Sequence, residues 1–128
     1  ATGLESYSEK VRKHLGKNFS NDDIRWFFNK CQEYNISLFI MLIVGYPTET
    51  EEDFEEGLSF FDEFEHLADD NTITGLQLGH TMQVIEGSPS WEQRSELGIT
   101  YENLPNVESF YRWRNANSDL KQRIKRRQ

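Results

Sequence analysis

The stretch MLIVGYPTETEEDF, residues 41–54, decides the fold that we expect for this chain. It continues an apolar run that starts at Leu38, breaks at Gly45-Tyr46-Pro47 and leads into a helix start. An apolar run without alternation is typical of a strand buried on both faces of a parallel sheet. Ligands of open and barrel-shaped α/β proteins bind at the carboxyl ends of such strands. The loop of residues 45–50 is therefore the first candidate for a ligand site.

The composition limits the kind of protein that the chain can be. Its 128 residues correspond to about one domain, and the 28% of charged residues argues against a membrane protein. The apolar run is far shorter than the ~20 residues that span a bilayer. A single cysteine, Cys31, excludes an internal disulfide and a multi-cysteine metal site within the chain, and it agrees with a reducing compartment. We therefore expect a cytoplasmic protein with no membrane partner and no metal ligands of its own.

The net charge of -8 conceals an uneven distribution. Residues 48–70 contain eleven Asp or Glu and no Lys or Arg, whereas residues 111–128 contain seven Lys or Arg and one Asp. An acidic run of this kind is mostly a solvated helix face. The basic C-terminus could contact nucleic acid, but a short charged tail is usually only solvated, so nucleic-acid binding is the less favoured interpretation.

Helical and strand-like patterns alternate along the chain, which is typical of a β/α fold. Expected helices run from Ser8 to Lys17, from Ser20 to Asn35, from a cap at Thr48 or Thr50 towards Asp69, from Ser88 through Leu97, and from Val107 through the basic tail. Three strands are expected: one that ends at Ser6, whose beginning we expect to be missing from the chain, one over residues 38–44 and one over residues 73–78.

These patterns also predict where several side chains lie. Ser6 and Glu9 have the spacing of a capping box, as do Ser20 and Asp23. Asn35 stands where the end of a helix needs a left-handed residue. Arg12 falls on the exposed basic side of the first helix. Two apolar stripes are expected in the core, namely Ile24, Phe27, Phe28 and Cys31, and Phe54, Leu58, Phe61, Phe64 and Leu67. On this assignment a Phe61→Ala substitution costs about 3–5 kcal/mol of stability.

His80 is the better histidine candidate for a site. It follows the strand of residues 73–78 and would therefore lie at the carboxyl edge of the sheet. A structural or solvated histidine is the more common role at such a position.

Two motifs and a turn, taken together, resemble a known family. They are Gly3-Leu4-Glu5-Ser6, the run from Ile43 to Phe54, and Gly87-Ser88-Pro89. Their order and spacing resemble the radical S-adenosylmethionine (SAM) family, and more narrowly the second half of the partial (β/α)6 barrel in its cobalamin-associated and methylthiotransferase-like members. This resemblance implies an α/β, TIM-like half-barrel of about three parallel strands flanked by helices over residues 1–100. A helical extension with a basic tail then follows over residues 101–128.

The resemblance also implies cofactor-binding residues. In relatives, the strand end with Gly-x-Glu-Ser holds SAM through polar side chains, a role that falls here to Glu5 and Ser6. The family's G-x-I-x-G-x-x-E strand meets the adenine and matches here at Ile43, Gly45 and Glu49.

Two features of this second motif leave questions open. Met41 stands in place of the first glycine of the family motif. Gly45 would permit close approach of a ligand to the backbone, whereas Glu49 either contacts the cofactor or braces the loop. With His80 added, these residues are the expected cofactor site, and we expect no catalytic residue in the chain.

The family's 4Fe-4S cluster is bound by a C-x-x-x-C-x-x-C loop that the chain lacks, and Cys31 has no partners. On this interpretation the chain is part of a longer enzyme, called the parent enzyme below. The parent enzyme uses SAM and the cluster, and the resemblance also allows cobalamin. The chain alone is then an inactive fragment whose partners are the missing N-terminal half and, through an exposed sheet edge, a second copy. The alternative is a self-contained, non-enzymatic α/β module that binds a partner or nucleic acid through its basic tail.

Overall fold

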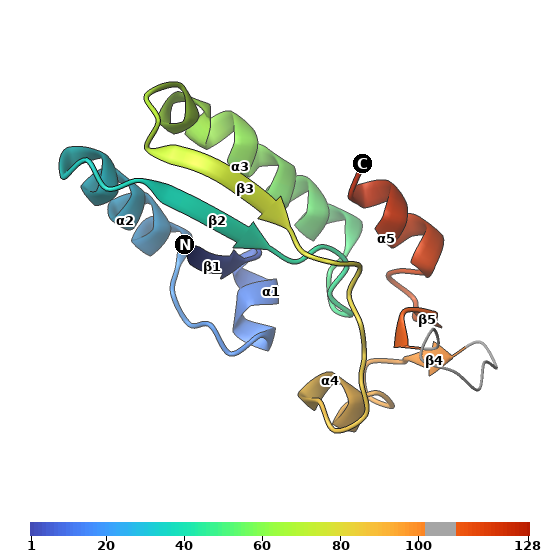
Figure 1. Cartoon of the computed structure of the whole chain (residues 1–128). Coiled ribbons are helices and arrows are strands. Elements are labelled where there is room, and N and C mark those ends of the chain that lie inside the picture. Colours follow the sequence, from blue (N-terminus) through green and yellow to red (C-terminus); the bar gives the residue numbers. More distant parts are fainter. Residues whose placement is uncertain (102–109) are drawn as a thin grey trace. The chain divides into compact units, whose positions relative to one another are not determined.

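The computed structural model of the chain describes residues 1–101 and 110–128 (Figure 1). Two compact units are formed, the first by residues 1–42 and 52–78 and the second by residues 43–51 and 79–128. The elements are β1 (Thr2–Glu5), α1 (Glu9–His14), α2 (Asn21–Glu33), β2 (Leu38–Leu42), α3 (Glu51–Asp69), β3 (Ile73–Leu78), α4 (Pro89–Glu92), β4 (Thr100–Tyr101), β5 (Trp113–Arg114) and α5 (Leu120–Arg126). No helix among these is long and apolar enough to cross a membrane.

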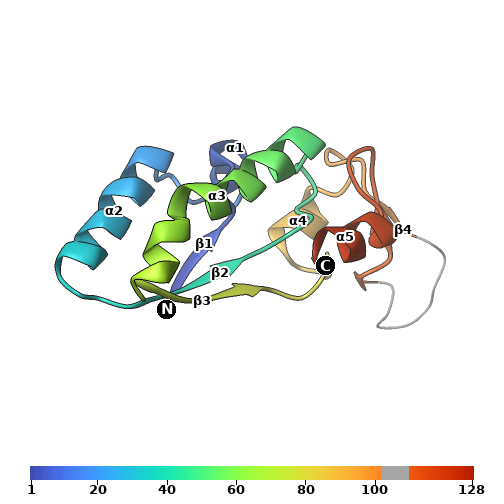
Figure 2. The ribbon, with the colours of Figure 1, turned by 90° about the horizontal axis from the view of Figure 1, so that it is seen from above.

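The first unit is built on a 3-stranded parallel sheet in the order β1-β2-β3. β2 is the central strand, with Ile40 paired to Thr2 of β1 and Leu42 paired to Leu78 of β3. The helices α1, α2 and α3 all lie on the same face of this sheet (Figure 2). The expected α/β fold with three parallel strands and flanking helices is therefore confirmed, and it is consistent with part of a TIM-like barrel.

The central strand differs from the expectation in its burial. Leu38, Ile40 and Leu42 are buried beneath the helices, whereas Phe39 is 40% and Met41 37% exposed. The prediction that β2 is buried on both faces is thus wrong, because the helices of this unit cover only one face of the sheet (Figure 2). On the uncovered face the Phe39 ring lies across Gly75, where a Cβ atom would approach it to 2.7 Å.

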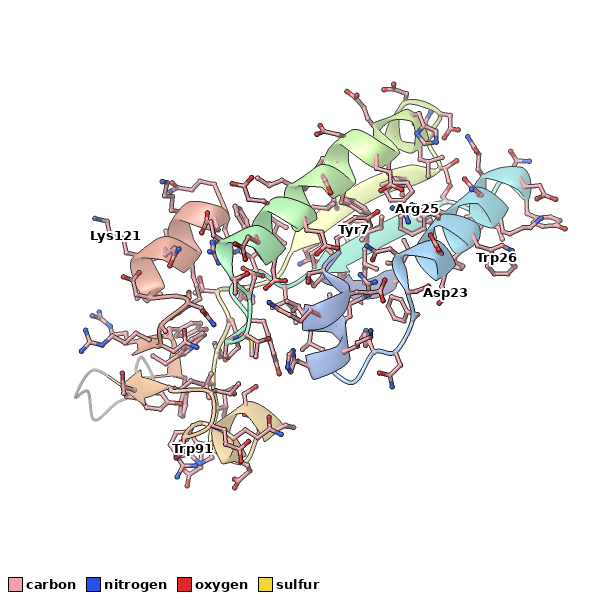
Figure 3. All side chains as sticks on the ribbon, turned by 180° about the vertical axis from the view of Figure 1, so that it is seen from behind. Tyr7, Asp23, Arg25, Trp26, Trp91 and Lys121 are labelled. Atoms are coloured by element: carbon pink, nitrogen blue, oxygen red, sulfur yellow. The ribbon has the colours of Figure 1, made fainter. Side chains whose placement is uncertain are left out.

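Aromatic rings join the helices to each other above the sheet. The centre of the Phe64 ring lies 4.9 Å from the centre of the Phe28 ring and 5.2 Å from that of the Phe60 ring. The Tyr7 ring packs edge-on against both Phe60 and Phe64. The Tyr7 hydroxyl donates to Glu63 of α3, which also accepts from Arg25 of α2 (Figure 3). Burial and the hydrogen bond to Glu63 raise the pKa of Tyr7 to about 12.

The buried stripe of α3 is shifted from the one predicted. Phe60, Phe64 and Leu67 are buried, whereas Phe61 is 45% and Leu58 47% exposed. The line of buried residues continues towards the helix start at Asp53, which is also buried. A polar residue on the core side interrupts the apolar pattern, so an apolar stripe traced from Phe54 falls on a neighbouring face of the helix.

The helix starts are partly as predicted. The capping box of Ser20 and Asp23 is present, and Asn35 has the expected left-handed backbone with a φ of 55°. The first helix is capped by Ser8 rather than Ser6, because the Ser8 hydroxyl accepts from the Val11 amide. Glu9 does not complete a capping box, since its carboxylate accepts from the Asn21 amide at 3.1 Å.

The second unit contradicts the predicted final helix. β5 pairs antiparallel with β4, and only residues 120–126 are helical after it. Trp113 is 0% exposed, packs with Val84 and Ile99, and donates from Nε1 to the Met82 carbonyl at 2.9 Å. The predicted start of the helix, Val107, lies outside the described residues. α4 is also shorter than predicted, ending at Glu92 rather than Leu97.

The difference in burial between Phe64 and Phe61 can be tested with two substitutions. We expect Phe64→Ala to lower the free energy of unfolding of the chain by about 3–5 kcal/mol, because it opens a cavity among aromatic rings. Phe61→Ala removes a half-exposed ring and should cost less than about 1.5 kcal/mol. Urea unfolding followed by circular dichroism measures both values. Equal losses for the two variants would contradict the assigned face of α3.

Candidate functional site

The backbone turns sharply where β1 ends. The Ser6 amide donates to the Leu4 carbonyl at 2.9 Å, which makes Glu5 the central residue of a three-residue turn with a φ of 66°. Residues with side chains rarely adopt a positive φ, and turns of this kind are strained. Strained backbone is concentrated at ligand-binding and catalytic positions, so this turn is a candidate site on its geometry alone.

A buried arginine and a lysine hold the turn at Glu5. Arg12 is 0% exposed and donates from Nη1 to the carbonyls of Ser6 and Tyr7, at 2.9 and 2.6 Å. Burial lowers the pKa of the Arg12 guanidinium. Lys17 donates from Nζ to the Gly3 carbonyl at 2.6 Å and to the Glu5 carboxylate at 2.8 Å. The prediction that Arg12 lies on an exposed helix face is therefore wrong, and the Glu5 carboxylate already carries a counter-ion.

The Ser6 side chain belongs to a buried polar cluster. Its hydroxyl accepts from the Ser8 amide at 3.2 Å, and the Ser8 hydroxyl donates to Asp53 at 2.8 Å. Lys10 forms an ion pair with the other oxygen of Asp53. Asp53, which we expected on a solvated face, is instead 8% exposed and joins α3 to the start of α1. This cluster fixes the segment that follows β1.

The loop after β2 is closed by a carboxylate. The Gly45 amide donates to Glu49 Oε1 at 3.0 Å, and Arg126 of α5 donates from Nη1 to the same oxygen at 2.9 Å. Both side chains of this ion pair are nearly fully buried, with Arg126 4% and Glu49 5% exposed. The arrangement is that of a loop brace, which is one of the two roles that we considered for Glu49.

Arg123 occupies the space beside Gly45. Gly45 has a φ of 84°, and a Cβ atom on it would lie 2.5 Å from both Cγ and Cδ of Arg123. The Arg123 guanidinium stacks 3.8 Å from the centre of the Trp113 ring and donates to the carbonyls of Tyr111 and Trp113. Desolvation lowers its pKa to about 10, which leaves it a cation at neutral pH. Glycine at position 45 therefore accommodates an arginine of the same chain.

The predicted site residues fall into two groups. Glu5 and Ser6 belong to the first unit, whereas Ile43, Gly45, Glu49 and His80 belong to the second. Gly45 and Glu49 share a hydrogen bond, Ile43 is half-buried and His80 is exposed. Three residues that sequence reasoning missed, Arg12, Arg123 and Arg126, hold the two loops, and no sequence signal marked them as buried.

The residues of the described part do not fit an iron-sulfur cluster. Cys31 is 3% exposed within the core, and burial raises the pKa of its thiol. Among residues 1–101 and 110–128 no group of three or more His, Cys, Asp and Glu side chains could hold a metal ion. Cluster ligands would have to come from elsewhere in a larger protein.

Comparison with known proteins gives matches to one kind of enzyme. The chain is 39% identical over 67 residues to the tRNA-2-methylthio-N(6)-dimethylallyladenosine synthase of Staphylococcus haemolyticus, 37% over 67 residues to that of Staphylococcus epidermidis, and 34% over 65 residues to that of Clostridium tetani. Each match covers 49% of this chain and 13–14% of the relative. No family model and no solved structure matches the chain.

These matches support a relationship to the radical SAM family, as the motifs indicate. They do not bear on which half of a barrel the chain represents, and they give no support for cobalamin. The matched part is only about one eighth of each relative, with 13% covered in the first two. The similarity alone therefore does not assign the activity of the relatives to this chain.

The contact between Gly45 and Arg123 can be tested with a matched glycine. Gly87 has a φ of 83°, almost that of Gly45, but nothing lies within 4 Å of the position of its Cβ. We expect Gly87→Ala to cost about 1 kcal/mol of stability through backbone strain alone. Gly45→Ala should cost about 2–4 kcal/mol, because overpacking against Arg123 is added to the same strain. Thermal unfolding measures both, and equal costs would show that Arg123 does not fill this space.

Proposed function

We propose that the chain is part of a radical SAM enzyme and contributes residues to its SAM site. The observation that carries this proposal concerns two neighbouring parallel strands, β1 and β2. One motif of this family lies at the end of β1 and the other follows β2, and each contains a residue with positive φ, Glu5 or Gly45. Carboxyl ends of parallel strands are the usual ligand positions in α/β folds. The similarity to the tRNA-2-methylthio-N(6)-dimethylallyladenosine synthases supports the same family.

The roles differ between the proposed residues. Glu5 and Ser6 supply a carboxylate and a hydroxyl at the end of β1, with Glu5 held by Lys17 at 2.8 Å. Ile43 supplies apolar surface and backbone groups beyond β2, whereas Glu49 shapes the loop on which Gly45 lies. His80, exposed after β3, completes the set. These groups bind and orient a ligand, and none of them is proposed as a catalytic residue.

The radical chemistry belongs to SAM and a 4Fe-4S cluster in the whole enzyme. Because the described residues provide no cluster ligands, we propose that the chain alone is inactive. The relatives are named for a tRNA modification, so methylthiolation of a tRNA is the first reaction to assay in the parent protein. The notion of a self-contained interaction module has no observation in its favour in the described structure.

We also propose the surface through which the chain meets the rest of its parent. β1 is an edge strand, and beside it lies an apolar groove of about 370 Å³ lined by Thr2, Leu4, Phe19, Trp26 and Phe27 among others. Trp26 is 64% exposed and stands on the outer side of α2 (Figure 3). An unpaired edge with apolar side chains beside it favours addition of a further strand. The preceding half of the barrel is the proposed occupant, and a second copy takes its place when that half is absent.

The SAM site is tested in the parent protein. We expect an upstream C-x-x-x-C-x-x-C sequence, and after anaerobic reconstitution the absorption of a 4Fe-4S cluster and cleavage of SAM. Glu5→Ala and Ser6→Ala should each raise the Kd for SAM, measured by calorimetry, by about 10–100-fold, the loss expected for a hydrogen bond to a charged group. Glu33→Ala, on the exposed side of α2, serves as the control. A parent without those cysteines, or an unchanged Kd in both variants, would refute the proposal.

The edge surface is tested with the chain of residues 1–128. We expect it to form dimers or higher oligomers in light scattering at high protein concentration. The double variant Trp26→Lys and Phe27→Lys should be monomeric, because two charges enter the apolar groove. Tyr34→Lys, at a residue that is 65% exposed but outside the groove, should leave the oligomer intact. This assignment is contradicted if the unsubstituted chain of residues 1–128 is monomeric, or if Tyr34→Lys disrupts the oligomer as much as the double variant does.

A further inference from the structure

A buried ion pair joins α5 to the loop after β2. The side chains of Arg126 and Glu49 are 4% and 5% exposed and meet at 2.9 Å, although they are 77 residues apart in the sequence. Removing one partner of such a pair leaves a desolvated charge without compensation, which costs far more than the pair itself contributes. The loop and α5 are therefore energetically coupled, and neither can move away while the other stays in place.

One oxygen atom transmits this coupling to the backbone. Glu49 Oε1 accepts from Arg126 Nη1 and also from the Gly45 amide, so the position of the amide is tied to α5 through a single carboxylate. A second anchor is Glu51, whose carboxylate accepts from Arg126 Nη2 and, at 3.2 Å, from Gln122. Both ends of the segment from Gly45 to Glu51 are thus held by α5.

The segment that precedes α5 holds the middle of the loop. Asn115 and Asn117 both donate from Nδ2 to the Pro47 carbonyl, at 2.7 and 3.0 Å. Asn115 Oδ1 accepts from the Asn117 and Ser118 amides, which fixes the direction of its own side chain. Arg123 packs its alkyl chain against Gly45. Residues 43–51 and the C-terminal segment accordingly fold as one compact unit.

We propose that Arg126 is a positioning residue, which acts through Glu49 to set the conformation of the loop after β2. The C-terminal segment of residues 113–126 is then an internal clamp on a ligand-binding loop rather than a solvated tail. Glu49 is the connection within this clamp and makes no contact with the ligand. In naming SAM as the ligand, the inference rests on the proposed function.

The test uses the full-length parent protein and three variants. Arg126→Gln breaks the ion pair and leaves the Glu49 carboxylate buried without its counter-ion. The double variant Glu49→Gln with Arg126→Gln buries no unpaired charge and still offers an amide oxygen to the Gly45 amide. Lys121→Gln is the control, because Lys121 is exposed on the same helix and extends away from it into solvent (Figure 3).

Two measurements are made on each variant. Hydrogen exchange of the peptide that contains residues 43–48 reports the loop, and calorimetry reports the Kd for SAM. In Arg126→Gln we expect exchange of this peptide to accelerate at least about 10-fold and the Kd to rise about 10-fold, the lower end of the loss seen when a residue that orients a metal ligand is replaced. The double variant should return the Kd to within about threefold of the parent value, and Lys121→Gln should change neither quantity.

The outcomes separate this inference from the proposed function. Unchanged exchange of residues 43–48 in both Arg126→Gln and the double variant overturns the clamp, whatever the protein binds. A Kd that the double variant fails to restore, with the loop protected, overturns the positioning role and assigns Glu49 to direct contact with SAM. A parent that does not bind SAM refutes the proposed function, and hydrogen exchange then still decides on the clamp.

Discussion

The burial of arginine side chains is the constraint on which both strand-end loops depend. A guanidinium taken out of water must have its donors satisfied, because an unpaired buried charge is among the most expensive groups in a protein. Arg12 donates to the carbonyls of Ser6 and Tyr7, and the Nη2 atom of Arg123 donates to those of Tyr111 and Trp113, although its Nε atom is buried without a hydrogen-bond partner among the described residues. Arg126 pairs through Nη1 with the carboxylate of Glu49. Arg12 and Arg126 thereby fix stretches of chain that lie outside helices and strands, whereas Arg123 fixes the chain at β5.

The two strand ends are similar in construction, which connects the fold to the proposed function. Each includes a left-handed residue, namely Glu5, the last residue of β1, with a φ of 66°, and Gly45, in the loop after β2, with a φ of 84°. Such conformations persist only where the surroundings determine them, and they are concentrated at sites of binding and catalysis. Arginine-held backbone thus follows both strands, and ligands of α/β proteins bind at the carboxyl ends of such strands. This property agrees with the family relationship, whereas the cluster that the family uses requires residues beyond those described.

Much of the local structure could be predicted from patterns, and the failures have specific causes. The capping box at Ser20, the left-handed Asn35 and the strand of residues 73–78 were correct, because short-range chemistry determines them. The stripe of α3 was misplaced because Asp53 lies on its buried side and is satisfied by Ser8 from another helix. The final helix was wrong because burial of Trp113 beside Val84 and Ile99 prevails over helical periodicity. The prediction that β2 is buried on both faces was wrong because the helices of this unit cover a single face of its sheet.

The sequence by itself determined the class of fold and the two motifs, since apolar runs, helix caps and turn residues act between near neighbours. Only the tertiary structure decided that Gly45 accommodates Arg123 and that Glu49 is neutralised by Arg126. Arg126 carries no local sign of burial in the basic tail, because the carboxylates of Glu49 and Glu51 that pair with it lie far away in the chain. Arg126 and Glu49 are 77 residues apart, and a contact at that separation follows from the fold as a whole rather than from the residues around either partner.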